Sequence, residues 1–320
     1  MSRPPSVREL WLGLSAIAAL WSLAAAQWVL SGKVVPWDAK NQSYAFFRFL
    51  ASALHSGSTP FWNPYHYGGH PSVADPQSLI FAPAFLVWAW FDSAPSMMTF
   101  DLIVYAHLLV GGLALGMMGW RMGWPWPAVV LAAAVFMLGG PAAGRLTHTG
   151  MIISYGLFPP ALLLMQLALE RRSMLLAASF AVVAGLLVLE RNHVSLLLSF
   201  ALAALFVGEV MAAERPMRWM RERWRVIAAM AVVGLAIIVV PLLLTLQFAA
   251  VSNRPQVQLE EALLGSLYPA NLANLAVANV WARSRPRSPT GDRTTRPCRK
   301  RRPRTGRSRT CSSAPRPCCF

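Results

Sequence analysis

Hydrophobic residues come in seven long blocks along this chain, rather than in the alternation of apolar and polar positions that marks a half-buried strand. The first block, Leu10–Leu30, has about 21 residues, which at 1.5 Å per residue match a hydrocarbon core of roughly 30 Å. Such blocks predict membrane-spanning helices. The remaining six lie at about Thr99–Trp120, Trp124–Pro141, Met151–Leu169, Met174–Leu189, Ser195–Ala213 and Val226–Ala250.

Leu10–Leu30 has a rival interpretation as a cleavable signal peptide, because Arg3 and Arg8 precede it. The apolar run is longer than the hydrophobic region of a usual signal peptide, and no small-x-small cleavage site follows directly. We therefore expect the segment to be retained as a spanning helix.

Two shorter segments in the first polar region also predict helices. Leu79–Phe91 is apolar but has only 13 residues and contains Pro83, so it reads as a re-entrant or interfacial helix. Asn41–His55 has apolar residues at helical spacing, which predicts an amphipathic helix on the membrane surface, flanked by interfacial aromatics. Its apolar positions are Tyr44, Phe47, Leu50, Ala51 and Leu54, and the flanking aromatics are Trp37 and the Pro60-Phe61-Trp62 turn.

Basic residues near the block ends predict the orientation, because positive charge accumulates on the cytoplasmic side. A cytoplasmic N-terminus puts ten arginines inside, five of them in the run Glu214–Arg225, which reads as a cytoplasmic loop anchored at lipid headgroups. Were Leu79–Phe91 a full crossing, this run would be translocated, so seven spans are the better count. Residues 31–98 then form a large extracytoplasmic loop.

Composition agrees with a polytopic all-α membrane protein, since 56% of the residues are hydrophobic and only 13% are charged. The formal net charge of +16 suggests nucleic-acid binding, yet +12 of it lies in residues 283–320, together with all four cysteines. We predict a membrane domain at 1–281 and a disordered basic tail at 282–320. The tail reads either as an arm that binds RNA or anionic lipid, or, as we favour, as the product of a reading-frame shift.

The polar segment between Val35 and Pro83 carries the candidate chemistry, with two aspartates, three histidines and many aromatic residues. Hydrocarbon would not tolerate such a segment, which indicates a site that faces water at the membrane surface. Its ordered motifs are Trp37-Asp38, Gln42, Gly57-x-x-Pro60-x-Trp62-Asn63-Pro64-Tyr65, Gly69-x-Pro71 and Asp75-Pro76-Gln77-Ser78.

In these motifs the chain, up to about residue 281, resembles the bacterial YfhO-type membrane proteins of the C-type (GT-C) glycosyltransferase superfamily. The resemblance implies transfer of a sugar from a polyprenyl-phosphate donor on the outer face of the membrane, with an acidic residue of the first outer loop in catalysis. Asp38 is the matching position. Related chains continue past Tyr268-Pro-Ala-Asn-Leu with more helices, whereas this one changes to the basic tail.

Each aspartate of the loop has a catalytic and a structural interpretation. Asp38 follows the first span closely, so its carboxylate can deprotonate an acceptor hydroxyl, or it can cap the helix that starts near Asn41. Asp75 precedes a proline and can start a turn, or it can act as a second catalytic or metal-binding carboxylate.

The histidines and aromatics of the loop predict ligand binding more than metal binding. His66 and His70 are four residues apart, but two glycines between them break a helix and disfavour a zinc pair. A sugar or phosphate pocket is more plausible, and a well-packed loop is the structural alternative. The further substrate-binding candidates of this loop are Trp62, Asn63 and Tyr65.

Two arginine–histidine pairs fall at the outer ends of later spans. They are Arg145 with His148, three residues apart, and Arg191 with His193, two residues apart. Arginine provides a bidentate fork for phosphate, so these residues are the phosphate-binding candidates. The alternative is that they are loop residues or snorkelling anchors, with Glu190 paired to Arg191.

The sequence contains no Walker A loop, no G-x-G-x-x-G motif and no H-E-x-x-H motif. An ATPase, a dehydrogenase or a zinc protease is therefore not supported. The resemblance implies a glycosyltransferase of the bacterial inner membrane that binds a polyprenyl-phosphate sugar donor and membrane lipid, and we expect no nucleic acid and no cofactor, with a divalent metal ion left open. The alternatives are a non-enzymatic transporter or assembly protein for lipid-linked saccharides, and an inactive truncated product.

Overall fold

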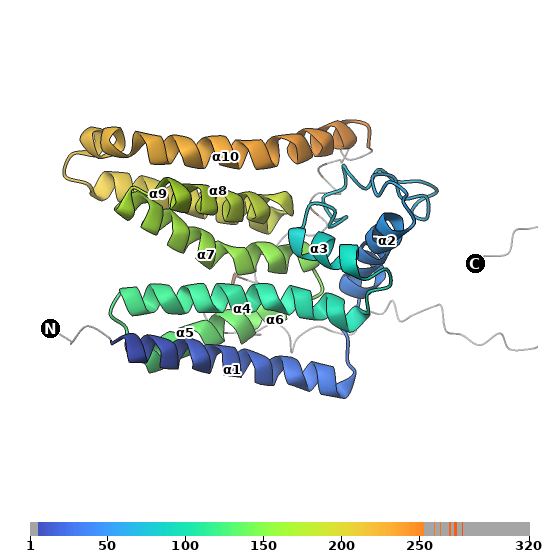
Figure 1. Cartoon of the computed structure of the whole chain (residues 1–320), viewed down its shortest axis with the longest axis horizontal. Coiled ribbons are helices and arrows are strands. Elements are labelled where there is room, and N and C mark those ends of the chain that lie inside the picture. Colours follow the sequence, from blue (N-terminus) through green and yellow to red (C-terminus); the bar gives the residue numbers. More distant parts are fainter. Residues whose placement is uncertain are drawn as a thin grey trace, which may run out of the picture. The chain divides into compact units, whose positions relative to one another are not determined.

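The computed structural model describes residues 6–252 together with six single residues further on, and within these residues every regular element is a helix (Figure 1). The six single residues are Leu259, Leu263, Pro269, Leu272, Ala273 and Val277. The chain divides into two units after Gln256, and all the elements below belong to the first. The predicted tail at 282–320 lies outside the described residues.

Eleven helical elements follow one another in the described part of the chain. They are α1 (Val7–Ser31), the π-helical η1 (Ala39–Ser43), α2 (Tyr44–His55), α3 (Pro83–Phe91), α4 (Met97–Arg121), α5 (Trp126–Leu138), α6 (Gly140–Ala143), α7 (Thr149–Arg171), α8 (Met174–Leu189), α9 (His193–Ala212) and α10 (Pro216–Ala250). Each predicted block has become a helix, and the fifth one has the predicted bounds.

Six of the described helical segments are long and apolar enough to cross a membrane, which makes this a multi-pass membrane architecture. They are α1, α4, α5 with α6, α7, α9 and α10. Helix α8 is apolar but has 16 residues, which at 1.5 Å per residue gives about 24 Å, less than the hydrocarbon thickness. The long helices lie side by side, and η1, α2 and α3 gather at one end, which we call the loop end (Figure 1).

Local sequence signals place the helix ends. Ser6 caps α1 in a reciprocal pairing with Glu9, and Gly32 ends the same helix with the left-handed φ of 63° that glycine adopts readily. Ser96 and Asn192 cap α4 and α9 through their side-chain oxygens. These caps satisfy backbone N–H groups that a helix start leaves without partners.

Helix α4 lies at the centre because its glycines let three neighbours approach closely. A Cβ on Gly156 of α7 would lie 2.4 Å from the carbonyl oxygen of His107, and one on Gly111 would lie 2.6 Å from the carbonyl oxygen of Gly156. On other faces of α4, Gly112 meets Met137 of α5 and Gly116 meets Ile17 of α1. We call the contact between α4 and α7 the glycine seam, because only glycine fits on both sides of it.

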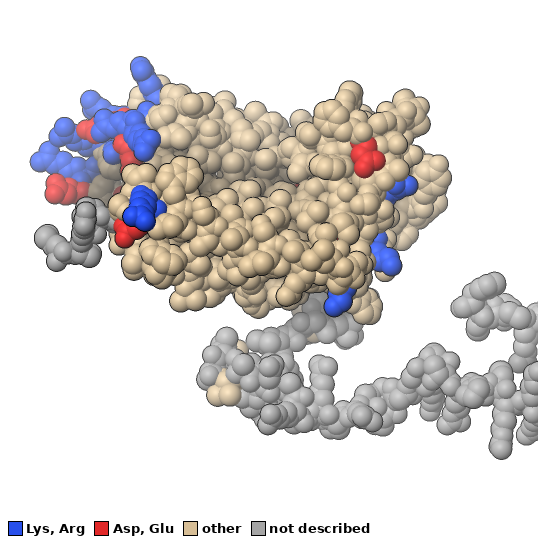
Figure 2. Space-filling view, turned by 60° about the horizontal axis from the view of Figure 1, so that its bottom comes forward, with Lys and Arg blue, Asp and Glu red and all other residues tan. Residues whose placement is uncertain are grey.

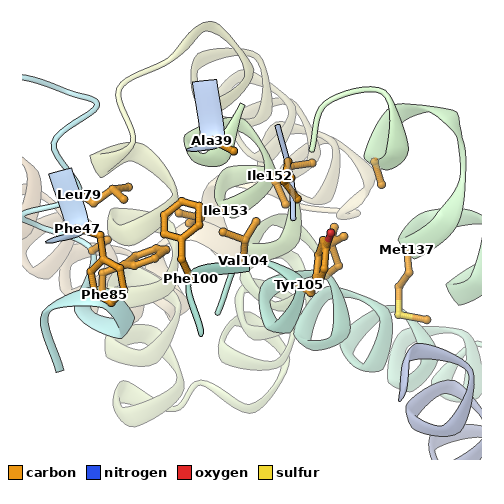
Figure 3. Packing of buried hydrophobic residues seen from close by; sticks show 14 of the residues in the cluster. Ala39, Phe47, Leu79, Phe85, Phe100, Val104, Tyr105, Met137, Ile152 and Ile153 are labelled. Carbon is orange, nitrogen blue, oxygen red and sulfur yellow. The ribbon is translucent and has the colours of Figure 1, made fainter. Parts of the chain in front are cut away.

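The amphipathic helix α2 packs against protein. Its predicted apolar residues Phe47, Leu50 and Ala51 are buried in the main core, where Phe47 contacts Phe85 of α3 and Phe100 of α4 (Figure 3). The sequence did not predict that α3 supplies an apolar partner for this face of α2. The place of α2 at the membrane surface stays a prediction. Helix α3 begins at residue 83 rather than 79, since the preceding residues form a turn.

Helix α10 is longer than predicted. The arginine-rich run that the sequence assigned to a loop is helical from Pro216 onward, so one helix of 35 residues continues from it into the apolar block. Proline at the first helical position suits this start, because its missing N–H has no helical partner there. Lys and Arg gather at the end of the helices opposite the loop end, which we call the arginine end (Figure 2).

Candidate functional site

A small polar pocket opens at the loop end, where η1 and the following loop meet the starts of α7 and α9. Its volume is about 70 Å³. The lining residues come from four separate parts of the chain and include both predicted and unpredicted candidates: Asp38, Gln42, Ser43, Pro76, Gln77, Leu79, Thr147, His148, Thr149, Gly150, Met151, Glu190 and Asn192. We call it the Asp38 pocket. It brings together two of the predicted site residues, Asp38 and His148.

Asp38 is held at the mouth of this pocket with its carboxylate free. Trp37 has a left-handed backbone with φ of 60°, which is strained for a bulky residue and turns the chain sharply just before Asp38. The Asp38 side chain is 63% exposed and makes no capping hydrogen bond to η1. The capping interpretation is therefore wrong for this residue, and the carboxylate is available to a ligand.

His148 faces Asp38 at a distance that leaves room for another atom. Its Nε2 lies 3.9 Å from the Asp38 Oδ2, which is longer than a hydrogen bond. Its Nδ1 lies 3.0 Å from the Thr147 hydroxyl, which fixes the ring. A hydroxyl or a water to one side of the pair can therefore bond to both side chains.

Glu190 is the residue of the pocket that sequence reasoning missed. It is 6% exposed, and its carboxyl lies against Gly150 at the start of α7. Burial raises its pKa to about 8, against a smaller opposing effect of Arg191. No ion pair joins Glu190 to Arg191 within the described chain, so the expected pairing is not formed. At neutral pH the carboxyl is protonated and can donate a hydrogen bond.

A second Asp–His pair lies in the same loop, but it is closed. The His70 Nε2 lies 2.8 Å from the Asp75 Oδ2, and both residues are buried. The other carboxylate oxygen, Oδ1, accepts the backbone N–H of Gln77 at 2.8 Å, which is the turn predicted for Asp75. Phe248 of α10 packs edge-on against the His70 ring. Both carboxylate oxygens of Asp75 thus bond within the protein, and the side chain is buried.

Arg191 ties this closed pair to α10. Its guanidinium donates to the backbone oxygens of Asp75 and Pro241, both at 3.1 Å, and to the hydroxyl of Thr245. That hydroxyl donates in turn to the backbone oxygen of Ala74 at 2.9 Å. Burial lowers the pKa of Arg191, while Glu190 and Asp75 raise it. We call this arrangement the Arg191 clamp, formed by His70, Asp75, Arg191 and Thr245.

The other two basic candidates remain exposed. Arg145 lies in the turn before α7, and its backbone oxygen accepts the N–H of His148 at 2.8 Å. Neither Arg145 nor His193 makes a side-chain hydrogen bond or an ion pair with the described residues. Arg145, two residues before Thr147 of the Asp38 pocket, and Lys40 of η1 are thus exposed cations that are available for a phosphate.

The remaining predicted residues border a separate, larger groove beside α2, with a volume of about 620 Å³. Trp62, Asn63, Tyr65 and His66 line it together with Arg48. The Tyr65 ring packs against Phe49, and the His66 ring packs against Phe46. Trp62 covers Gly69, where a Cβ would lie 2.6 Å from the indole ring. Contacts within the loop and with α2 therefore hold the groove walls in place.

An apolar crevice lies between α1, α4 and α5, and one short chain segment links it to the Asp38 pocket. Its volume is about 160 Å³, and its walls include Trp21, Trp28 and Tyr105. Leu146 lines the crevice, and the next two residues along the chain line the Asp38 pocket. An apolar space and a polar space thus meet at one short segment, residues 146–148.

No group of three metal-ligating side chains occurs within the described residues. The His66 and His70 rings have centroids 5.5 Å apart in a turn, not on a shared helix face. The chain matches no protein-family model, no curated protein and no solved structure. Its resemblance to the YfhO-type proteins stays a prediction.

Proposed function

We propose that this chain is an integral membrane glycosyltransferase that transfers a sugar from a polyprenyl-phosphate donor to an acceptor on the outer face of the bacterial inner membrane. The observation that carries the proposal is the Asp38 pocket, where an exposed carboxylate faces His148 beside an apolar crevice. A lipid-linked phosphosugar has the matching division into an apolar tail and a polar head. The crevice suits the tail and the pocket suits the head.

The proposed topology has seven spans, a cytoplasmic N-terminus and the loop end outside. Its support is the clustering of arginines at the ends of α4, α7 and α10 that lie opposite the loop. Helix α8 is the span that is added to the six long ones. Its length of about 24 Å requires local thinning of the bilayer, which has a modest cost in free energy.

In the proposed reaction Asp38 accepts the proton of the acceptor hydroxyl. The acceptor oxygen attacks the anomeric carbon of the sugar, and the bond from that carbon to the phosphate oxygen breaks. The bonding electrons stay on the leaving polyprenyl phosphate. Arg145, His148 and protonated Glu190 supply the positive charge and the hydrogen-bond donors that stabilise this phosphate.

The Arg191 clamp has a positioning role in this scheme. The Asp75 and Arg191 side chains are engaged within the protein, so Asp38 alone takes the role of base and Arg145 that of phosphate ligand. The groove with Trp62 and Tyr65 suits the acceptor. Its aromatic rings offer flat apolar faces to a sugar, and its hydroxyl groups can form hydrogen bonds with the hydroxyls of that sugar.

A transfer assay with the full chain in lipid nanodiscs tests the proposal. The probes are undecaprenyl-phosphate-linked hexoses with a radiolabelled sugar, supplied with an extract of bacterial envelope glycolipids as acceptor. Asp38→Asn should lower the transfer rate by about 10²- to 10⁴-fold, the usual contribution of a general base. The matched control is Asp92→Asn, a loop-end aspartate that does not line the pocket. Equal activity of Asp38→Asn and the unchanged protein would overturn the assignment.

A second candidate function is a non-enzymatic carrier or assembly protein for lipid-linked saccharides, and the large groove beside α2 favours it. This alternative predicts that Asp38→Asn still complements a deletion strain, while removal of the aromatic side chains of Trp62 and Tyr65 does not. The glycosyltransferase predicts loss of complementation in both variants.

A further inference from the structure

The first three turns of α10 extend beyond the part of the helix that can lie in hydrocarbon. The helix has 35 residues and therefore a length of about 52 Å, against a hydrocarbon core of roughly 30 Å. Its apolar part begins at Val226, which leaves residues 216–225 at the level of the lipid headgroups. This extension lies at the arginine end.

One face of this extension packs against the protein. Arg223 donates from Nε to the backbone oxygen of Leu169 at 2.9 Å, and its guanidinium lies over the Trp219 ring. Glu222 accepts hydrogen bonds from Arg172 and Arg218. The buried residues Val226, Met230 and Pro241 continue this inward side along the helix.

The opposite face carries two arginines without acidic partners. Arg221 and Arg225 are both exposed and form no ion pair with any described residue. Trp224 is 59% exposed, and the Arg225 guanidinium lies 5.7 Å from the centre of its ring. Because the two arginines are four residues apart, their like charges repel each other on one helix face. A bound anion would remove that repulsion.

This outward face runs straight into the lipid-facing stripe of the span. Arg221 and Trp224 share their helix face with exposed apolar residues at spacings of three and four: Val232, Leu235, Val239, Leu242 and Leu246. The side of α10 that meets acyl chains in the bilayer therefore meets headgroups one to two turns beyond its apolar part. The occupant that fits both the position and the charge is a phospholipid.

We propose that Arg221, Trp224 and Arg225 form a binding site for the headgroup of an acidic phospholipid. The arginines pair with the phosphate and the acidic headgroup, and the tryptophan lies at the interface beside the acyl chains. The site lies at the opposite end of the helices from the Asp38 pocket, so the proposal is independent of the proposed function. It gives the protein a preference for anionic over zwitterionic lipid.

Native mass spectrometry of the full chain in detergent, titrated with phosphatidylglycerol or phosphatidylcholine of matched acyl chains, tests this site. We expect tighter retention of phosphatidylglycerol, and an affinity for it about 30-fold weaker in the double variant Arg221→Gln with Arg225→Gln, at about 1 kcal/mol for each arginine. Affinity for phosphatidylcholine should not change. The double variant, its control and the unchanged protein all keep the basic carboxyl-terminal segment. The contribution of that segment to lipid affinity therefore cancels in the comparison.

The matched control is Lys33→Gln with Lys40→Gln, which removes the same charge from exposed residues at the loop end. The control should keep the affinity of the unchanged protein for phosphatidylglycerol. Equal weakening in the two double variants would show a net-charge effect and would overturn the site. For the case that the arginine variant fails to insert, the unchanged protein is measured in rising salt. A preference for phosphatidylglycerol that does not fall with salt would also overturn the site.

Discussion

Two Asp–His pairs of the same composition lie at the loop end, and the difference between them separates structure from chemistry. The pair of Asp75 and His70 is buried at 2.8 Å, and the other carboxylate oxygen of Asp75 accepts the N–H of Gln77. The pair of Asp38 and His148 is half-exposed at 3.9 Å with space between the side chains. A polar group whose partners are all supplied by the fold holds the fold together. A polar group held in place without partners can meet a substrate.

The largest expected effect concerns the buried carboxyl of the open pocket. Glu190 has an ordinary pKa of 4.5, and burial raises it to about 8. The folded protein therefore holds this proton more tightly than the unfolded chain, so ionisation removes stability as pH rises from 4.5 to 8. Glu190→Gln should be no more stable than the unchanged protein below pH 4.5, and several kcal/mol more stable at pH 8, on the order of 1.4 kcal/mol for each pKa unit.

Thermal unfolding in detergent micelles from pH 4 to pH 9 measures this difference. A stability advantage of Glu190→Gln that is constant over this range would show that folding does not change the pKa of Glu190. The open pocket would then lack its protonated donor.

The next effect concerns the closed pair. Asp75→Ala leaves His70 and the N–H of Gln77 without their acceptors in a buried place, which should lower the free energy of unfolding by about 2–3 kcal/mol. Asp38→Ala should change it by less than about 0.5 kcal/mol, because its side chain is exposed and makes no hydrogen bond. Chemical denaturation measures the free energy of unfolding of both variants. Similar losses in the two variants would erase the distinction between them.

A similar contrast holds for the two arginines. Arg191→Met should destabilise the protein by about 1–3 kcal/mol, since the backbone oxygens of Asp75 and Pro241 lose a charged donor. Arg145→Met should leave stability unchanged and weaken donor binding, which a thermal shift with undecaprenyl phosphate reports. If undecaprenyl phosphate protected Arg145→Met as well as the unchanged protein, the phosphate would bind elsewhere.

The smallest effect sharpens the description of the clamp. Thr245→Val keeps the volume of the side chain but removes its hydroxyl from both Arg191 and the Ala74 oxygen, which should cost about 1 kcal/mol. Thr149→Val at the start of α7 is the control, because the Thr149 hydroxyl is buried without a hydrogen-bond partner. Loss of stability in the control alone would contradict the hydrogen bonds described here.

Helices followed from the sequence because a membrane span requires a long apolar block, and each block gave one. The amphipathic pattern of α2 identified Phe47, Leu50 and Ala51, which are buried, but it missed the buried Phe46 and Ala53. The arginine-rich start of α10 was harder, because charge density predicts exposure and does not distinguish a loop from an exposed helix.

The candidate site was only partly predictable. Asp38 and His148 stood out by residue type and by position at the span ends, and the structure brings them into one pocket. Glu190 did not stand out, because its neighbour Arg191 offered an obvious partner. The fold turns that arginine toward Asp75 and α10 instead. Which charges are satisfied depends on long-range contacts that no local pattern records.

The glycine seam has a consequence for how a lipid-borne substrate could enter. Two backbones that touch without side chains between them are packed tightly, so we expect α4 and α7 to act as one rigid unit, a strut. Under the proposed function, we expect the lipid-borne donor to enter beside this strut. Helices α1 and α5 flank it at the crevice, and a rocking of either would admit a chain while the strut keeps residues 146–148 in register.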